Sequence, residues 1–175
     1  MPVYAPPQRL QRVSTAEQSL LDAWAEGVSL ESDTDRSIEE LRRRAAVDRW
    51  WLAHDFRRRG RKMVALTPPQ HRDAVSRFYY AMYHAFRAVV FIDFGGDDHE
   101  AHSTLQKNIP QNFPSRQQWA NRLKNARLDR NGADYDPYPK SDTAWKSASQ
   151  RLSADTDELL SLTKTYLVTT GCSGL

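Results

Sequence analysis

The stretch ARLDRNGADYDPYP, residues 126–139, combines arginines, an Asp-Tyr pair, a glycine and two prolines within fourteen residues. Arg130 and Tyr135 supply hydrogen-bond donors, and Asp134 supplies a carboxylate that can form an ion pair with an arginine. The glycine and the two prolines of this stretch are typical of a break in a helix. The sequence therefore predicts a loop here, following a helix that ends at Gly132, with its polar groups available to a neighbouring element or to a ligand.

A second row of polar residues follows one face of the strongest helical pattern in the chain. Its members are four, three, four and three residues apart, which aligns them on a helix: Asp73, Arg77, Tyr80, His84 and Arg87. Apolar stripes cover more than half of that helix, so it is expected to be mostly buried, and because an unpaired buried charge is costly, these side chains need partners. The predicted loop at residues 126–139 offers them.

Two interpretations of the expected contact between this polar row and the predicted loop stay open. In the structural one, Arg77 and Asp134 form an ion pair that clamps the loop onto the helices. In the functional one, Arg130 is kept for a ligand, because no acidic residue stands in an obvious register to pair with it. Arg127 is a further candidate binding residue in the same stretch.

Helical periodicity dominates the chain, and no segment has the alternation typical of a strand. A short first helix is predicted from Ser14, whose spacing to Glu17 is typical of a capping box, to Gly27. The other predicted helices span 36–59, ended by Gly60; 70–94, ended by Gly95 and Gly96; a short piece of 97–109; 115–131, ended by Gly132; and 141–170.

These elements predict an all-α fold, an antiparallel up-and-down helical bundle with an extra short N-terminal helix. The helix over 70–94 carries two adjoining apolar stripes, so we expect it at the centre of the bundle. The expected organisation is an N-terminal extension at 1–35, the bundle at 36–170 and a flexible tail at 171–175.

Two features of the predicted helix over 36–59 leave alternatives open. Adjacent Trp50 and Trp51 cannot both face one core, so one of them is expected at a subunit interface or at a surface on which bases stack. The run RRRGRK at 57–62 fits either cations that complement a helix C-terminus or a phosphate-binding patch.

Composition narrows the class of protein. The 175 residues carry a formal net charge of +3, and the only cysteine is Cys172, so no internal disulfide can form. No apolar run is long enough to span a membrane and the N-terminus lacks a signal-like core, which predicts a cytoplasmic protein. The sequence DDHEAH could supply metal ligands through His99 and His102, but a capped helix start is the simpler interpretation; we predict no metal and no cofactor.

The helix sequence RFYYAMYHAFRAVV, a following glycine turn, the tripeptide AHS and the motif R-x-x-A-D-Y at 130–135 resemble the HEPN domain family. The motifs cover residues 73–135, and the order of helices is similar over 36–166. The resemblance implies a helical bundle that pairs with a second copy of itself. In active members, an Arg-x4–6-His motif from each subunit meets at the dimer cleft and cleaves RNA without metal, by attack of the 2′-hydroxyl.

In this chain Arg130 matches the arginine of that motif, and Asn131 matches the polar residue that often follows it. No histidine occurs after His102, and the motif's histidine position falls among Asp134, Tyr135, Asp136 and Pro137. Either His84 or His102 supplies the imidazole, or the site binds RNA or a nucleotide without cutting it. The candidate catalytic residues are therefore Arg130, Asn131, Tyr135 and His84, and the candidate binding residues are Arg77, Tyr80, Arg87, His102, Asp134 and Arg127.

The resemblance also implies partners. RNA and a second copy of the chain are expected, in a ribonuclease of toxin–antitoxin or phage-defence type. The alternative is a non-catalytic binding module that works with a nucleotidyltransferase-type antitoxin or in a defence complex, in which Tyr135 and Tyr138 are candidate sites of nucleotide attachment.

Overall fold

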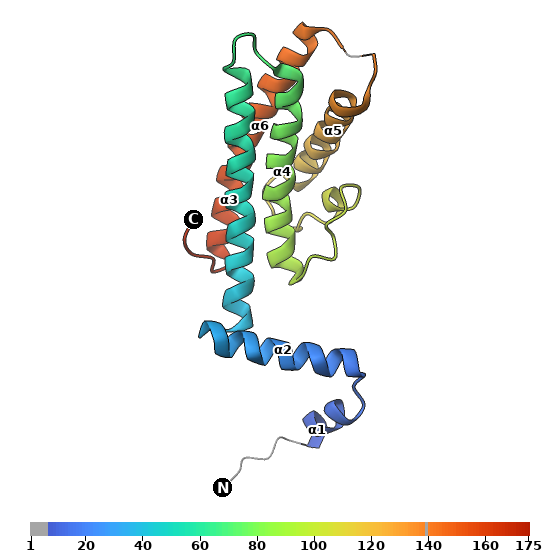
Figure 1. Ribbon diagram of the computed structural model, residues 1–175, viewed down its shortest axis with the longest axis vertical. Coiled ribbons are helices and arrows are strands. Elements are labelled where there is room, and N and C mark those ends of the chain that lie inside the picture. Colours follow the sequence, from blue (N-terminus) through green and yellow to red (C-terminus); the bar gives the residue numbers. More distant parts are fainter. Residues whose placement is uncertain (1–6, 139) are drawn as a thin grey trace. The chain divides into compact units, whose positions relative to one another are not determined.

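The computed structural model describes residues 7–138 and 140–175, and within these ranges the chain is entirely α-helical apart from turns and one 3₁₀ helix. This confirms the predicted all-α bundle (Figure 1). The elements are α1 (Pro7–Ser14), α2 (Gln18–Thr34), α3 (Ile38–Val64), α4 (His71–Phe94), the 3₁₀ helix η1 (Leu105–Lys107), α5 (Arg116–Tyr135) and α6 (Asp142–Thr169). None of the helices in the described ranges is long and apolar enough to cross a membrane.

The chain divides into two compact units, residues 1–41 and 42–175. In the first unit α2 begins after Glu17 and continues through Gly27 to Thr34, so the predicted end at Gly27 is wrong. The predicted capping box is also absent, because Ser14 belongs to α1. One interior glycine costs a helix only about 1 kcal/mol relative to alanine, which the surrounding residues of α2 can offset.

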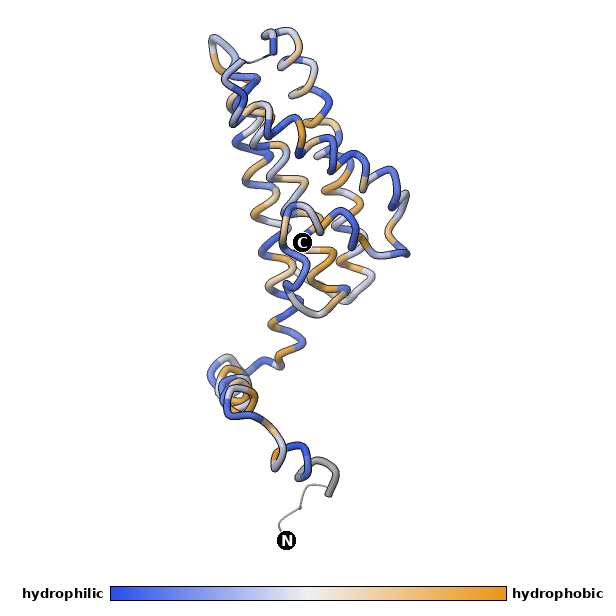
Figure 2. The backbone as a smooth tube through the Cα atoms, turned by 90° about the vertical axis from the view of Figure 1, so that its right-hand side faces the viewer, coloured by the Kyte–Doolittle hydropathy of each residue, from blue (hydrophilic) through white to orange (hydrophobic). Residues whose placement is uncertain are grey.

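In the second unit the helices run up, down, up and down in the order α3, α4, α5, α6 (Figure 1). The bundle helices carry both hydrophobic and hydrophilic positions, as the colouring of the tube shows (Figure 2). α4 is central, as expected from its two apolar stripes: Phe78, Tyr79, Met82, Phe86 and Val89 are all essentially inaccessible to solvent.

α4 ends at the predicted signal, and α6 begins at a serine cap that the sequence analysis did not single out. Gly95 ends α4 in the left-handed conformation, with φ 79°, and its N–H donates to the carbonyl oxygen of Phe91. Ser141 caps the N-terminus of α6, where its hydroxyl accepts a hydrogen bond of 3.3 Å from the backbone N–H of Ala144.

α3 extends past its predicted terminator. Gly60 lies inside the helix and is buried, and α3 continues to Val64. A Cβ atom at position 60 would lie 2.8 Å from the ring of Phe78. The glycine therefore serves the close approach of α3 to α4 and does not end the helix.

The two adjacent tryptophans of α3 differ in burial, as predicted. Trp50 is buried and its Nε1–H donates to the carbonyl oxygen of Leu160 at 3.1 Å, whereas Trp51 is 49% exposed. The Nε1–H of Trp51 donates to the carbonyl oxygen of Gly174 at 3.2 Å. Cys172 is buried. The C-terminal residues, which we expected to form a flexible tail, thus contact α3.

Candidate functional site

Much of the stretch predicted as a loop is helical. α5 runs from Arg116 through Gly132 to Tyr135, and its C-cap residue Asp136, immediately before Pro137, adopts an extended conformation. The predicted end at Gly132 is therefore wrong. All four residues taken from the motif, Arg130, Asn131, Asp134 and Tyr135, lie in the C-terminal part of α5.

Tertiary contacts hold this C-terminal part against α4. The guanidinium of Arg72 donates from Nε to the carbonyl oxygen of Ala133 at 2.7 Å and from Nη2 to that of Asp136 at 2.9 Å. The hydroxyl of Ser76 donates to a carboxylate oxygen of Asp134. Carbonyl groups at a helix C-terminus lack partners within the helix, so a cation from α4 satisfies them.

The helical conformation gives Arg130 an acidic partner that sequence reasoning missed. Asp134 stands four residues later on the same helix, and its Oδ2 lies 2.8 Å from Nε of Arg130. The expected ion pair between Arg77 and Asp134 is wrong, since Asp134 bonds Arg130 and Ser76 instead. No ion pair or hydrogen bond to the partly buried Arg77 occurs within the described ranges.

The guanidinium of Arg130 is held among aromatic rings. Its Nη2 donates to the hydroxyl of Tyr80 at 2.5 Å, and its Nη1 donates to Oδ1 of Asn131 at 3.2 Å. Its central carbon lies 5.3 Å from the ring centre of Tyr80 and 5.0 Å from that of Tyr135. Burial would lower the pKa of Arg130, but Tyr80, Asp134 and Tyr135 outweigh it and raise the pKa.

His102 joins this group from the loop after α4. Its Nδ1 lies 2.6 Å from the hydroxyl of Tyr79, and its ring centre is 4.2 Å from that of Tyr83 and 6.1 Å from that of Tyr80. We expected a buried histidine, but the residue is exposed. Partial burial, followed by the charges of Arg130 and Arg127, lowers the pKa of His102 below 6.5, so the imidazole is neutral at pH 7.

We call the group made by Arg130, Tyr80, Tyr135, His102 and Arg127 the Arg130 cluster. Arg127 is partly buried, and its positive charge opposes the raised pKa that burial gives Tyr79. Its Nε has no hydrogen-bond partner within the described part of the chain. The cluster therefore combines two guanidinium groups, exposed aromatic surface and one neutral imidazole.

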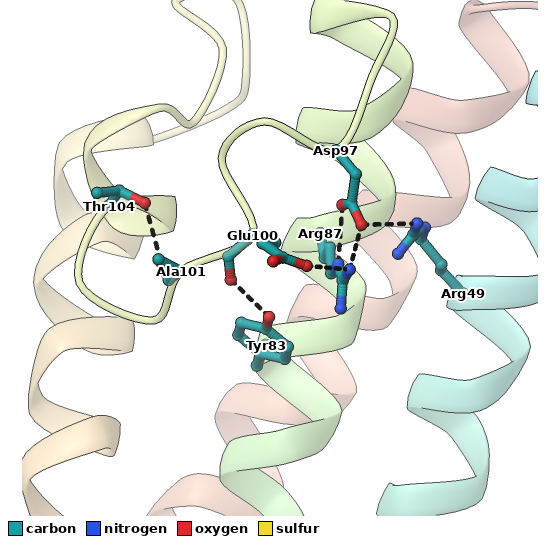
Figure 3. A network of polar contacts seen from close by, with 7 residues as sticks. All are labelled: Arg49, Tyr83, Arg87, Asp97, Glu100, Ala101 and Thr104. Carbon is teal, nitrogen blue, oxygen red and sulfur yellow. Dashed lines mark hydrogen bonds and ion pairs between the residues drawn. The ribbon is translucent and has the colours of Figure 1, made fainter. Parts of the chain in front are cut away.

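Arg87, a candidate binding residue, instead anchors the loop that carries His102 (Figure 3). Its guanidinium bonds the carboxylate of Asp97, with one contact of 2.9 Å, and that of Glu100 at 2.8 Å. Arg49 of α3 bonds the same Asp97 at 3.1 Å, and the hydroxyl of Tyr83 donates to the carbonyl oxygen of Glu100 at 2.6 Å. These contacts fix the position of the backbone two residues before His102.

His84 does not reach Arg130. Its ring is stacked on Phe56, with centres 5.2 Å apart, and packs edge-on against Tyr83. Its Nδ1 is buried and has no hydrogen-bond partner within the described residues. Burial, with the charges of Arg87 and Arg49, lowers the pKa of His84 to about 4. Of the two candidate imidazoles, the structure thus brings only His102 into the cluster.

Replacing His84 with phenylalanine should flatten the dependence of stability on pH. In the folded protein the pKa of His84 is about 4, below its ordinary 6.5, so its stabilising neutral form is fully present above pH 6.5 and is lost as the pH falls towards 4. We expect the free energy of unfolding of the unaltered protein to drop by about 1–2 kcal/mol more over this interval than that of His84→Phe, after allowance for partial exposure. Urea titrations at pH 7.5, 5.5 and 4.5 measure the difference; parallel curves for the two proteins would contradict it.

The remaining candidates lie apart from the cluster. Asp73 is exposed, and Tyr138, a candidate for nucleotide attachment, is 86% exposed beyond the end of α5. The ring of His99 packs edge-on against Phe94 at 4.3 Å, and within the described residues no group of three or more metal-binding side chains gathers around it. Tyr79, Arg72 and Ser76 were missed. Tyr79 belongs to one of the apolar stripes of α4, and the sequence gives no separate signal for Arg72 and Ser76.

No protein-family model, curated protein or solved structure matches this chain. The resemblance to the HEPN family therefore stays a prediction that rests on the quoted motifs.

Proposed function

We propose that this chain is a HEPN-like protein that acts on RNA through the Arg130 cluster, as a metal-independent endoribonuclease. The observation that carries the proposal is the placement of a neutral imidazole, His102, in the same cluster as the guanidinium groups of Arg130 and Arg127. A guanidinium suits the charge and geometry of a phosphate, and a neutral imidazole can accept a proton near pH 7. The exposed ring of Tyr135 adds a surface on which a base can stack.

The proposed reaction uses the RNA, one water molecule and side chains of the protein. The 2′-oxygen attacks the adjacent phosphorus, His102 accepts the proton of the 2′-hydroxyl, and Arg130 stabilises the negative charge that accumulates on the phosphoryl oxygens. The bond from phosphorus to the 5′-oxygen breaks, the 5′-oxygen takes a proton from water, and the products carry a 2′,3′-cyclic phosphate and a 5′-hydroxyl.

The role of His102 depends on its tautomer. When Nδ1 carries the proton and donates to the oxygen of Tyr79, Nε2 is free to accept the proton of the 2′-hydroxyl. When the hydroxyl of Tyr79 donates to Nδ1, Nε2 carries the proton and can only donate, for example to a phosphate oxygen. Burial raises the pKa of Tyr79, which keeps this phenol protonated in either arrangement.

The second candidate function is binding of RNA or a nucleotide without cleavage, as a module associated with a nucleotidyltransferase-type partner. The contacts of Arg130 favour it: Tyr80, Asn131 and Asp134 already engage the three nitrogens of its guanidinium. An arginine held in this way can still bind a phosphate through its remaining N–H groups. We propose that either activity is exercised by a homodimer of the kind that the resemblance implies.

Cleavage of total RNA in the presence of EDTA tests the proposal. We expect the unaltered protein to cleave and Arg130→Ala to be slower by about 10²–10³-fold, because the charge of the reacting phosphate loses its main stabilising group. The control is Arg116→Ala, which alters another arginine of α5 outside the cluster. Equal cleavage by the unaltered protein and Arg130→Ala, or none by either, would rule out the enzyme; binding of 2′-O-methyl RNA, which cannot be cleaved this way, then decides whether the second candidate holds.

A further inference from the structure

A groove lies along the face of α3 that carries the exposed tryptophan. It encloses about 590 Å³ and is lined by Trp51, His54, Asp55, Arg57, Arg58, Arg61, Lys62 and Ala65. The sequence run RRRGRK thus contributes most of its cations to this cavity, and two of them, Arg61 and Lys62, also lie in the last turn of α3, where cations complement the helix C-terminus. We refer to it as the Trp51 groove.

The groove carries an excess of positive charge. Its three arginines and one lysine face two carboxylates: Asp157, shared by Arg57 and Arg61, and Asp55, which bonds Arg58 at 2.7 Å. Lys62 is exposed, and within the described ranges it makes no ion pair or hydrogen bond. Two positive charges therefore remain over the carboxylates, one of them on a side chain that is free to meet an anion.

The indole of Trp51 is exposed and held in place. It is 49% exposed, yet its Nε1–H is bonded to the carbonyl oxygen of Gly174, and Trp50 packs edge-on against it with ring centres 4.8 Å apart. His54 packs beside it at 5.6 Å, and burial, with Arg57 and Lys164, lowers the pKa of His54 so that it is uncharged at pH 7. An aromatic face that is fixed before binding loses little conformational freedom when a planar group stacks on it.

We propose that the Trp51 groove is a second RNA-binding surface, which takes a single strand by stacking one base on Trp51 and placing the neighbouring phosphates against Lys62 and Arg58. Exposed aromatic rings among cations are the arrangement that binds single-stranded nucleic acid without sequence preference. The choice of RNA as the ligand rests on the proposed function, whereas the groove itself does not depend on it.

The Trp51 groove is separate from the Arg130 cluster. Phe56, which packs on Tyr80 with ring centres 5.4 Å apart, faces the cluster. At about 3.6 residues per turn, Arg58 of the groove lies about 160° around α3 from Phe56, so the two side chains point to nearly opposite sides of the helix. The groove would therefore hold a part of the strand other than the one placed at Arg130, and its loss should weaken binding without removing the reacting groups.

Fluorescence anisotropy with a labelled 2′-O-methyl oligouridine of about twelve nucleotides tests this assignment. Trp51→Leu should weaken binding by roughly 5- to 150-fold, and Trp51→Phe, which keeps a ring, should weaken it much less. Lys62→Ala should reduce the slope of log affinity against log salt by about 0.7, the contribution of one phosphate contact. The control is Lys124→Ala, which removes the same charge from an exposed position of α5. Because Trp51 and Lys62 are exposed, the variants should keep the thermal midpoint of the unaltered protein.

The outcomes separate this inference from the proposed function. Loss of affinity in Trp51→Leu and Lys62→Ala, with full affinity in Lys124→Ala, supports the groove whatever Arg130→Ala does. Loss only in Arg130→Ala leaves the proposed function intact and overturns the groove. Loss in Lys62→Ala without loss in Trp51→Leu describes a cationic surface with no stacking and also overturns it, as does an unaltered protein that does not bind the oligonucleotide.

Discussion

Replacing His102 with glutamine should slow RNA cleavage by about 10²–10⁴-fold while leaving the affinity for RNA within a few-fold of the unaltered value. The imidazole is the only group in the Arg130 cluster that can accept a proton near pH 7, and general base catalysis contributes an effect of this size. Glutamine can still bond the hydroxyl of Tyr79, so the loop should keep its place. Single-turnover cleavage of a short RNA in EDTA, with excess protein, measures the chemical step directly.

The matched control for this change is His99→Gln. His99 lies in the same loop, but its ring packs against Phe94, outside the Arg130 cluster. The His99→Gln variant should cleave RNA at the same rate as the unaltered protein. If His102→Gln also cleaves at that rate, His102 is not the base. If neither it nor the unaltered protein cleaves, yet both bind 2′-O-methyl RNA and Arg130→Ala does not, the protein is the binding module of the second candidate function.

Replacing Gly60 with alanine should destabilise the protein by up to about 2 kcal/mol, although alanine is the better helix former. The added Cβ would lie 2.8 Å from the ring of Phe78, and both residues are buried, so the ring or the helix must shift. Overpacking a tight core costs about 1–3 kcal/mol, and the gain in helix propensity offsets about 1 kcal/mol of that cost. Urea unfolding followed by circular dichroism gives the free energy.

The substitution Gly132→Ala should change the free energy of unfolding in the opposite direction. Gly132 also lies inside a helix, but a Cβ there would meet only the ring of Trp145, at an ordinary 3.7 Å. We expect it to stabilise the protein by roughly 0.5–1 kcal/mol through helix propensity alone. Equal effects of the two substitutions would show that contact with Phe78 does not decide the role of Gly60.

The sequence was sufficient to predict the helices whose signals are local. α4 was found through its two apolar stripes and its terminal Gly95, and α6 through the helical spacing of its apolar residues, because periodicity and helix ends are properties of neighbouring residues. Gly60 and Gly132 misled the prediction for the same reason. The sequence alone does not distinguish a glycine that makes room for a neighbouring ring from a glycine that ends a helix. For Gly60, the packing of α3 on α4 makes the distinction.

The candidate site was predicted in its members but not in its contacts. The sequence analysis named both of its arginines, its tyrosines and His102 as candidate residues. It missed the pairing of Arg130 with Asp134, because this pairing requires α5 to continue past Gly132. That continuation depends on Arg72 and Ser76, which bind the end of α5 from another helix. Likewise, the bond between His102 and Tyr79 depends on the path of a loop, and the spacing of residues carries no information about that path.

The carboxylate of Asp97 has a consequence for the interpretation of kinetics. Its hydrogen bond to Arg87, together with the charge of Arg49, lowers its pKa, so Asp97 keeps its charge throughout the range in which an imidazole titrates. An acidic limb in a plot of reaction rate against pH within that range would then report the protonation of His102 itself, and not the loss of the contacts that hold its loop.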